Sequence, residues 1–328
     1  MTKKSRPKKG SHAYSPRKRA RSIVPHISAW STNGDRVKIQ GFAGYKVGMS
    51  HAFMTDYRPA STTAGQEVRV PISIIETPPI NVVGIRGYKL TPYGYKTLTE
   101  AWATNLSKEL AKRIPLPKKP SQKWGPIDSA DEIFALVQTF PDKVHSIPSK
   151  VPELMEIRIG GGTVADRIEY AKSILGKEID ASDVIKEGDM LDIVGITKGK
   201  GFQSRTKRFG TKLLSHKNSK HRRMIGTQGP WHPSWIRSSV PSDGQMGYHQ
   251  RTECNKRVLK VSTNAEEINP NGGFPHYGVV KNKYLVIHGS IPGPAKRLLR
   301  MRDAVRYQKG VKPDRVTLSY VSQTSKQG

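Results

Sequence analysis

The chain of 328 residues carries 56 Lys or Arg against 26 Asp or Glu, which gives a formal net charge of +30 and an isoelectric point near 10.2. This charge makes a nucleic acid the first expected partner and an anionic membrane surface the weaker alternative. No apolar run approaches the roughly 18 residues of a spanning helix, and no secretory-type apolar region precedes the rest. A single cysteine, Cys254, excludes an internal disulfide framework and a cysteine-cluster zinc site. We therefore expect a soluble protein that stays inside the cell.

The first 21 residues hold nine Lys or Arg and no acid, together with prolines and no apolar pattern. Such a segment is expected to be disordered alone and to become ordered on a nucleic acid. A mitochondrial-type presequence is the weaker alternative, because those peptides are amphipathic and this one has no apolar face. Residues 1–40 are therefore assigned as a basic N-terminal extension.

Short apolar runs rich in Val, Ile and Tyr follow from Gly41, each bounded by Gly, Pro, Asn or Thr. They cover residues 41–54, 68–76 and 80–90. These runs predict closely spaced strands of a small antiparallel barrel. Further on, Leu98, Trp102, Leu106, Leu110 and Ile114 recur at every fourth position. This spacing predicts a helix over 96–114 that ends before Pro115.

A Pro/Lys linker at 115–126 leads into an acidic region, because residues 128–195 hold fourteen of the acids but only seven of the bases. Its pieces alternate between helix-like (130–140 and 164–176) and strand-like (154–161 and 190–197). Three glycines, 160–162, lack the spacing of a dinucleotide fingerprint and predict a turn before a helix that starts near Val164. The expected organisation is a β-barrel domain of residues 41–97 and 190–328 with an α/β lobe inserted at 98–189, and this lobe should face solvent.

Residues 195–257 form a long basic loop that follows an apolar strand and has almost no hydrophobic periodicity. From Lys198 to Arg257 there are fourteen Lys or Arg and two acids, Asp243 and Glu253. Cations neutralise phosphates, glycines let the main chain approach them, and interleaved aromatic side chains stack on unpaired bases. A disordered basic linker is the alternative, but such linkers are poor in aromatics, whereas this loop has Trp231 and Trp235.

After the loop, residues 256–264, 278–293 and 315–322 predict further strands of the barrel. Residues 294–309 are ambiguous, because they fit either a helix that opens at Pro294 or a basic edge strand. In both cases we expect Arg297, Arg300, Arg302 and Arg306 to face an acidic partner.

Other motifs are weaker. Gly195 to Gly201 resembles a phosphate-binding loop, but it has three residues between glycines where nucleotide triphosphatases have four, and Gly follows Lys200 where they have Ser or Thr. We therefore expect only that backbone N–H groups and a lysine of this segment contact phosphate, as they do in such loops. The histidines of the loop lie among cations, which favours phosphate or base contacts over a metal. No nucleophile constellation is recognisable. We therefore expect no catalytic site, no metal, no cofactor and no small-molecule substrate.

Three segments resemble the large-subunit ribosomal protein L-three family in its archaeal and eukaryotic form. They are GFAGYKVGM at 41–49, VGITKGKGFQ at 194–203 and GPWHPSWIRSSVPSDGQMGYHQRTECNKR at 229–257. The last segment is the most specific, and the resemblance covers nearly the whole chain. It implies a mainly β protein, with a translation-protein-type β-barrel and an α/β insert, whose long basic extensions penetrate large-subunit ribosomal RNA. Neighbouring large-subunit ribosomal proteins and a cytoplasmic location on the ribosome are implied as well.

The resemblance places residues 198–202 in the family's barrel-to-RNA loop. It places residues 231–233, 244–245 and 247–249 in a central finger that reaches toward the peptidyl transferase centre. In gap-free register the tryptophan near the eukaryotic fingertip corresponds to Ser238, and Trp235 lies three residues earlier. The residues expected to contact ribosomal RNA are Lys198, Gly199, Lys200, Gly201, Phe202, Arg205, Lys207, Arg208, His216, Lys217, Lys220, His221, Arg222, Arg223, Trp231, His232, Trp235, Arg237, Gln245, Tyr248, His249, Arg251, Lys256, Arg257, Arg297, Arg300 and Arg302.

The expected function is a structural, RNA-organising role in assembly of the large subunit and in translation. An RNA-modifying enzyme with a basic substrate channel is the alternative from another class, and the missing catalytic constellation argues against it. A general chromatin-like binder is a third option, which predicts comparable affinity for duplex DNA and RNA.

Overall fold

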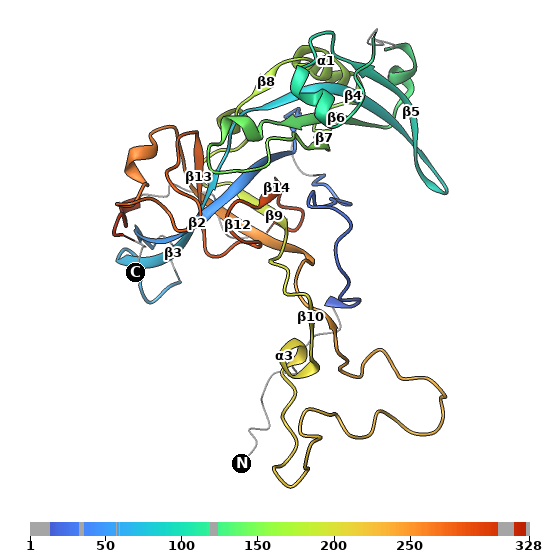
Figure 1. Cartoon of the computed structure of the whole chain (residues 1–328). Helices are drawn as coiled ribbons and strands as arrows, with labels where there is room; N and C mark the ends of the chain where they lie inside the picture. Colours follow the sequence, from blue (N-terminus) through green and yellow to red (C-terminus); the bar gives the residue numbers. More distant parts are fainter. Residues whose placement is uncertain are drawn as a thin grey trace. The chain divides into compact units, whose positions relative to one another are not determined.

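The fold was obtained as a computed structural model, and it describes residues 14–32, 36–56, 58, 60–118, 124–307 and 318–325 (Figure 1). Parts of the predicted N-terminal arm (1–13), linker (119–123) and last strand (315–317) lie outside the described residues. The chain divides into two compact units. We call residues 23–195 and 251–328 the sheet unit, and residues 1–22 and 196–250 the loop unit.

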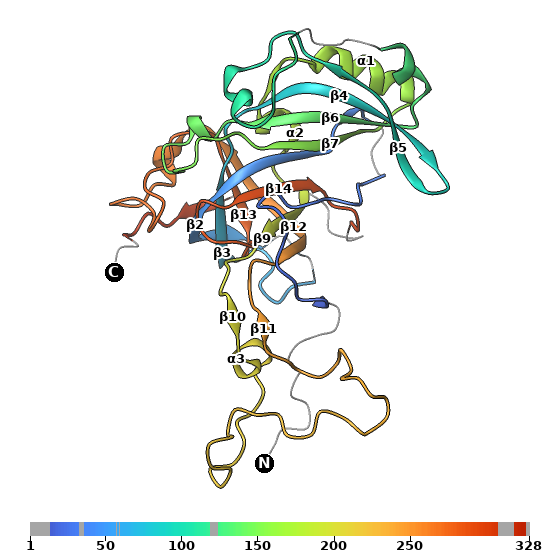
Figure 2. The same cartoon turned by 45° about the vertical axis from the view of Figure 1, so that its right-hand side comes forward.

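The first sheet of the sheet unit is antiparallel, with the order β1-β7-β6-β4-β5, and β8 pairs with the start of β4. Figure 2 shows β7, β6, β4 and β5 of this sheet side by side, with α1 next to them. The strands are β1 (Lys38–Ile39), β4 (Ile80–Thr91), β5 (Gly94–Trp102), β6 (Glu132–Thr139), β7 (Leu154–Gly160) and β8 (Glu178–Ile179). Because β6 lies between β4 and β7 and also contacts α1, it is buried along almost its whole length.

Helix α1 (Val164–Ile174) begins where the sequence predicts. Thr163 and Asp166 form a capping box, in which the Thr163 hydroxyl accepts from the Asp166 backbone N–H and the Asp166 carboxylate accepts from the Thr163 N–H. Gly161 and Gly162, with φ of 90° and 50°, form the turn before it. The predicted turn and helix start are therefore confirmed. The buried side of α1 packs on β6 and β7.

The second sheet has seven strands in the order β14-β9-β12-β13-β3-β2-β15, and β14 pairs with β2 as well as with β9. The strands are β2 (Gly41–Thr55), β3 (Glu67–Glu76), β9 (Met190–Ile196), β12 (Gln250–Ser262), β13 (Tyr284–His288), β14 (Leu298–Asp303) and β15 (Leu318–Val321). The predicted strands at 41–54, 68–76, 80–90, 154–161 and 190–197 are confirmed. The protein is thus mainly β, as expected.

The remaining elements are short. They are the 3₁₀ turns η2 (Lys108–Lys112), η3 (Gly125–Ser129), η4 (Pro141–Lys143) and η5 (Ala265–Glu267), the helices α2 (Ala181–Val184) and α3 (Arg205–Phe209), and the strands β10 (Phe202–Gln203) and β11 (Gly244–Gln245). The main apolar core takes side chains from both large sheets, among them Phe42, Ile85 and Ile157. Each such side chain contributes roughly 1.5–3 kcal/mol on full burial. Within the described residues, no buried apolar side chain lies between 197 and 249.

The helix predicted over 96–114 is wrong. Its first half is β5, a hairpin partner of β4, and its second half contains only η2. A spacing of four is also an even number of residues, so it fits one side of a regular strand as well as one side of a helix. In β5 the register shifts at Leu98, which has no opposite residue on β4. The apolar residues still gather as the spacing indicated, because Trp102, Leu106, Leu110 and Ile114 all join a small cluster with Val83 and Leu136.

Two further expectations are corrected. Residues 130–140 form strand β6 and not a helix, since an apolar run that is covered on both faces has no alternation to distinguish it. Residues 294–309 contain β14, which is neither a helix nor an edge strand, because β9 and β2 flank it on either side. The boundaries of the predicted insert at 98–189 stay a prediction. The structure adds that β4, which precedes the insert, pairs with β6 inside it.

Candidate nucleic-acid interface

The loop unit is held by a narrow antiparallel stem, which we define as residues 196–203 and 244–250. Strands β10 and β11 pair within it, and backbone hydrogen bonds continue the ladder toward its base. The Lys200 N–H donates to the Met246 carbonyl at 2.9 Å, and the Thr197 N–H donates to the His249 carbonyl at 2.9 Å. Figure 2 shows β10 and β11 next to each other, with α3 following β10. The long basic loop is therefore a shaped element at its base and not a featureless linker.

A glycine keeps the two limbs of the stem in close contact. Gly247 has a φ of 72°, and a Cβ atom at this position would lie 2.0 Å from the Lys198 carbonyl oxygen. Any other residue would push the limbs apart. The thin backbone expected from the glycines is needed here for packing of the stem on itself. Gly201 differs, because a Cβ added there would meet no atom within 4 Å, and only its φ of 65° favours glycine.

The described part of the N-terminal arm, residues 14–22, lies along this stem. The Ala20 N–H donates to the Tyr248 carbonyl at 2.8 Å, and His249 Nδ1 is 2.9 Å from the Lys18 carbonyl, to which it donates. The Arg19 guanidinium lies 5.5 Å from the centre of the Tyr248 ring. His249 is consequently only 8% exposed, and this predicted RNA-contacting residue is engaged by the arm.

Arg208 holds three backbone segments together. Its guanidinium donates to the carbonyl oxygens of Gln245 at 2.9 Å, Ser242 at 3.0 Å and Arg17 at 3.1 Å. Arg17 in turn donates to the Arg208 carbonyl at 3.0 Å, and both guanidinium groups lie over the Phe209 ring. Burial, followed by the nearby positive charge of Arg17, lowers the pKa of Arg208. Arg208 therefore positions the loop and the arm, whereas sequence reasoning grouped it with the phosphate contacts and did not single out Arg17.

Most of the other predicted cations in the loop unit point to solvent. The exposed Lys and Arg residues among them are Lys198, Lys200, Lys207, Lys217, Lys220, Arg222, Arg223 and Arg237, and the predicted histidines His216, His221 and His232 are exposed as well. Residues 196–250 contain one acid, Asp243, which accepts a hydrogen bond from the Arg205 backbone N–H at 2.5 Å and lies 3.5 Å from its guanidinium Nε. The loop thus carries a dense positive charge that its own acids do not neutralise.

A hollow of about 470 Å³ occurs between α3 and the loop that follows. Its lining is Ser204, Arg205, Lys220, His221, Arg222, Arg223, Met224 and Asp243. Arg223 Nη2 donates to the Ser204 hydroxyl at 2.7 Å, which draws the distant loop segment onto the helix start. Several cations are thereby brought together around one concave surface, an arrangement suited to phosphate oxygens.

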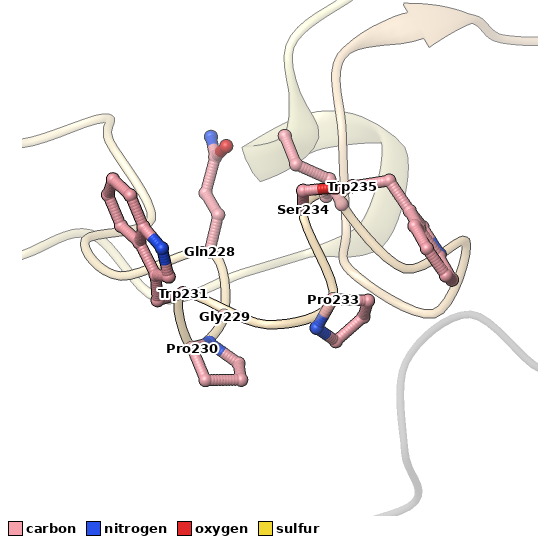
Figure 3. Close-up of a pocket in the computed structure, with 8 residues that line it drawn as sticks. Gln228, Gly229, Pro230, Trp231, Pro233, Ser234 and Trp235 are labelled. Atoms are coloured by element: carbon pink, nitrogen blue, oxygen red, sulfur yellow. The ribbon is translucent and has the colours of Figure 1, made fainter.

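The tip of the loop carries two exposed indole rings. Trp231 is 88% and Trp235 is 70% exposed, and Ile236 beside them is also exposed. Figure 3 shows the two tryptophans on opposite sides of a hollow of 430 Å³ with Pro230 and Pro233 between them. Exposed aromatic side chains of this size indicate a binding surface, and base–aromatic stacking is the contact that such rings favour on RNA. Phe202, 76% exposed on the stem, has the same character.

The predicted contacts on the sheet unit are mostly engaged within the protein. Arg300 is 6% exposed and donates to the backbone carbonyls of Pro25, at 3.0 Å, and Glu156, while its burial lowers its pKa to about 10. Arg302 pairs with the buried carboxylate of Asp192 at 3.0 Å. Lys256 pairs with Glu253 at 3.3 Å. The side chains of the other three are half-buried, namely Arg251, Arg257 and Arg297.

Within the described ranges, no group of three or more His, Cys, Asp or Glu side chains is placed to hold a metal ion. The helices that the structure describes include none that is both long and apolar enough to cross a membrane.

Comparison with known proteins gives the chain its family. The family model described as Ribosomal protein L3 matches residues 1–124 and 127–328. The chain is 51% identical to the large ribosomal subunit protein uL3 of Archaeoglobus fulgidus, and the match covers 98% of each chain. The proteins of the same description from Thermoplasma volcanium and Methanocaldococcus jannaschii are 52% and 50% identical, with 98% or more of each chain covered. The chain belongs to the ribosomal protein L3 family, whose members are structural ribosomal proteins and not enzymes.

Proposed function

We propose that the chain is a structural constituent of the large ribosomal subunit that binds and organises large-subunit ribosomal RNA. The observation that carries the proposal is the loop unit, in which exposed cations and aromatic rings extend from the stem and residues 196–250 hold a single acid. RNA supplies the phosphate charge and the unpaired bases that these two kinds of side chain bind. The archaeal relatives are named as proteins of the large ribosomal subunit, and from these names we infer the particle to which the chain belongs.

Two kinds of contact have separate roles in this proposal. The exposed cations Lys198, Lys200 and Lys207 grip phosphates, and each neutralised phosphate adds roughly 0.7–0.9 to the salt slope of the binding constant. Arg208 and Arg17 hold the loop against the arm so that the cations keep a common geometry. Trp231 and Trp235 at the tip stack on unpaired bases, and we propose that they form the finger that reaches toward the peptidyl transferase centre.

The sheet unit serves as the support for this loop. We propose that its seven-stranded sheet is the translation-protein-type barrel, which the pairing of β14 with both β9 and β2 supports. We also propose that the acidic region near 98–189 faces neighbouring ribosomal proteins and solvent, because it is poor in bases. A role in subunit assembly and a cytoplasmic, ribosomal location belong to the same proposal.

The test is sedimentation of cell extracts followed by a high-salt wash of the large subunits. We expect the chain to sediment with the large subunit and to remain there, because many phosphate contacts must be broken together. In parallel, competition binding should favour large-subunit RNA over duplex DNA of the same length. Release of the chain at modest salt, or equal affinity for duplex DNA, would contradict a built-in ribosomal role.

A further inference from the structure

The hairpin formed by the end of β4 and the start of β5 projects beyond the rest of the first sheet. The pairing of β6 with β4 ends at Glu132 opposite Tyr88, so residues 89–96 have only each other as strand partners (Figure 1). The turn is fixed, since the Thr91 hydroxyl donates to the Gly94 carbonyl at 2.7 Å and Gly94 has a φ of 112°. The hairpin is therefore an ordered projection of the sheet unit.

Large apolar side chains are exposed along this projection. Tyr93 at the turn is 101% exposed, and Leu90 and Tyr95, which lie opposite each other in the register, are 62% and 57% exposed. The Tyr95 ring contacts the Tyr88 ring at 6.0 Å between centres. Exposure of several large apolar side chains to water is energetically unfavourable, so this row indicates a surface that a partner covers.

The other face of the hairpin carries two lysines. Lys89 and Lys96 are exposed and lie directly opposite each other across the two strands. Like charges at such a position repel each other. Among the described residues neither ammonium group has an ion-pair partner, and the Asp131 carboxylate accepts from the Leu90 backbone N–H instead. Further along the strands, Glu100 and Glu156 are both paired with Arg86.

We propose that this hairpin tip is a second RNA-binding site, in which Lys89 and Lys96 straddle backbone phosphate and Tyr93 and Tyr95 stack on unpaired bases. This inference rests on the proposed function, because that function places the chain on ribosomal RNA. An opposed pair of unneutralised cations beside flat, exposed rings fits the phosphate and base of one unpaired strand. An acidic protein segment would pair with the lysines, whereas one unpaired RNA strand supplies both phosphates for the lysines and bases for the exposed tyrosine rings.

The experiment measures acylation of the two lysines by an amine-reactive reagent. The free full-length chain, intact large subunits that contain it, and the same subunits after ribonuclease digestion are compared by mass spectrometry. We expect Lys89 and Lys96 to react in the free chain, to be protected at least about tenfold in the subunit, and to react again after digestion. Lys186, an exposed lysine of the acidic region, serves as the comparison site.

Two results would overturn the proposal. Lysines that stay reactive in the intact subunit have no partner there, and lysines that stay protected after ribonuclease digestion are covered by protein. Ultraviolet irradiation of intact subunits gives a second readout, because trypsin releases Leu90 to Lys96 as one peptide that contains both tyrosines. We expect a nucleotide adduct on this peptide and loss of most of the adduct in the variant Tyr93→Ala. The fold should tolerate this variant, because the Tyr93 side chain is fully exposed. Absence of the chain from large subunits would contradict the proposed function instead.

Discussion

The two units use the same cationic side chains in opposite ways. In the sheet unit, Arg86, Arg158 and Arg302 are paired with carboxylates, and Arg300 is buried on backbone carbonyls. In the loop unit, residues 196–250 hold eleven Lys or Arg and one acid, and most of those cations are exposed. The count of basic residues alone therefore does not locate an RNA-binding surface. What locates it is positive charge that the fold leaves without an acid.

Removal of the loop should have the largest effect. Gln203 pairs with Gly244, so a two-residue Asn-Gly turn can replace residues 204–243 and keep the stem. This deletes nine of the cations, and the salt slope of RNA binding should shrink by several units, at roughly 0.7–0.9 per phosphate contact. The thermal midpoint should hold, because none of the described buried apolar side chains lies in the deleted segment. Binding at increasing salt and thermal unfolding measure the two effects, and a slope that changes by less than about one unit would be evidence against the loop as the grip.

Arg300 tests the comparison from the side of the sheet unit. Arg300→Met leaves the buried Pro25 carbonyl and the partly buried Glu156 carbonyl without their charged donor, and it should lower the free energy of unfolding by about 2–3 kcal/mol. The salt slope of RNA binding should stay the same, since the guanidinium does not reach solvent. Denaturant titration is the measurement, and Lys296→Met, at an exposed neighbouring position, is the matched control. An unchanged stability combined with a lower slope would mean that Arg300 is an RNA contact after all.

Lys207 and Arg208 are adjacent residues with contrasting environments. Lys207→Ala should reduce the salt slope by roughly 0.7–0.9 if its exposed ammonium neutralises one phosphate. Arg208→Ala should leave the slope almost unchanged but release the arm, so that trypsin cleaves between Arg17 and Arg21 faster in the free protein. Binding as a function of salt and a time course of cleavage separate the two roles. If the two variants behaved alike in both assays, the distinction between gripping and positioning would fail.

Trp235 should have the smallest effect on occupancy of the subunit. A lost base–aromatic contact costs about 1–3 kcal/mol locally, which is small beside the sum of the phosphate contacts. Trp235→Ala should therefore remain in the large subunit while peptide-bond formation, or its sensitivity to drugs of the peptidyl transferase centre, changes. Ser239→Ala, an exposed neighbour without a ring, is the control. Normal activity and drug response would leave Trp235 without a stacking role, and lost occupancy would mean that the tip also grips.

The sequence predicts a strand well where Val or Ile alternates with other residues, as in β3, and it predicts α1 because its cap is local. The prediction fails at residues 96–114, because pairing with β4 makes the first half of this segment a strand. It also fails at residues 130–140, because a strand that is buried on both faces shows no alternation of apolar and polar residues. Whether a segment pairs with another depends on contacts that are distant in the chain, so neither periodicity nor local propensity could decide these cases.

The candidate site follows the same rule. Charge and aromatic content identified the loop, and the family resemblance is confirmed by the comparisons. The roles of single residues needed coordinates, because Arg208 binds carbonyls from segments that lie 34 and 191 positions away in the chain. In the sequence alone, Arg300 and Lys200 are equivalent basic residues. Only their burial distinguishes a cation that supports the fold from one that is free to meet phosphate.

The most direct test of the contrast between the units is tryptic cleavage of the free chain, of intact large subunits and of subunits treated with ribonuclease. We expect trypsin to cleave after the Lys and Arg residues of the loop unit, from Lys198 to Arg237, in the free chain. These sites should be protected in the subunit and cleaved again after ribonuclease treatment. Paired arginines of the sheet unit, such as Arg158 and Arg302, should resist cleavage in all three states. Equal cleavage of the loop in the free chain and in the intact subunit would contradict the claim that its unneutralised charge is bound to RNA.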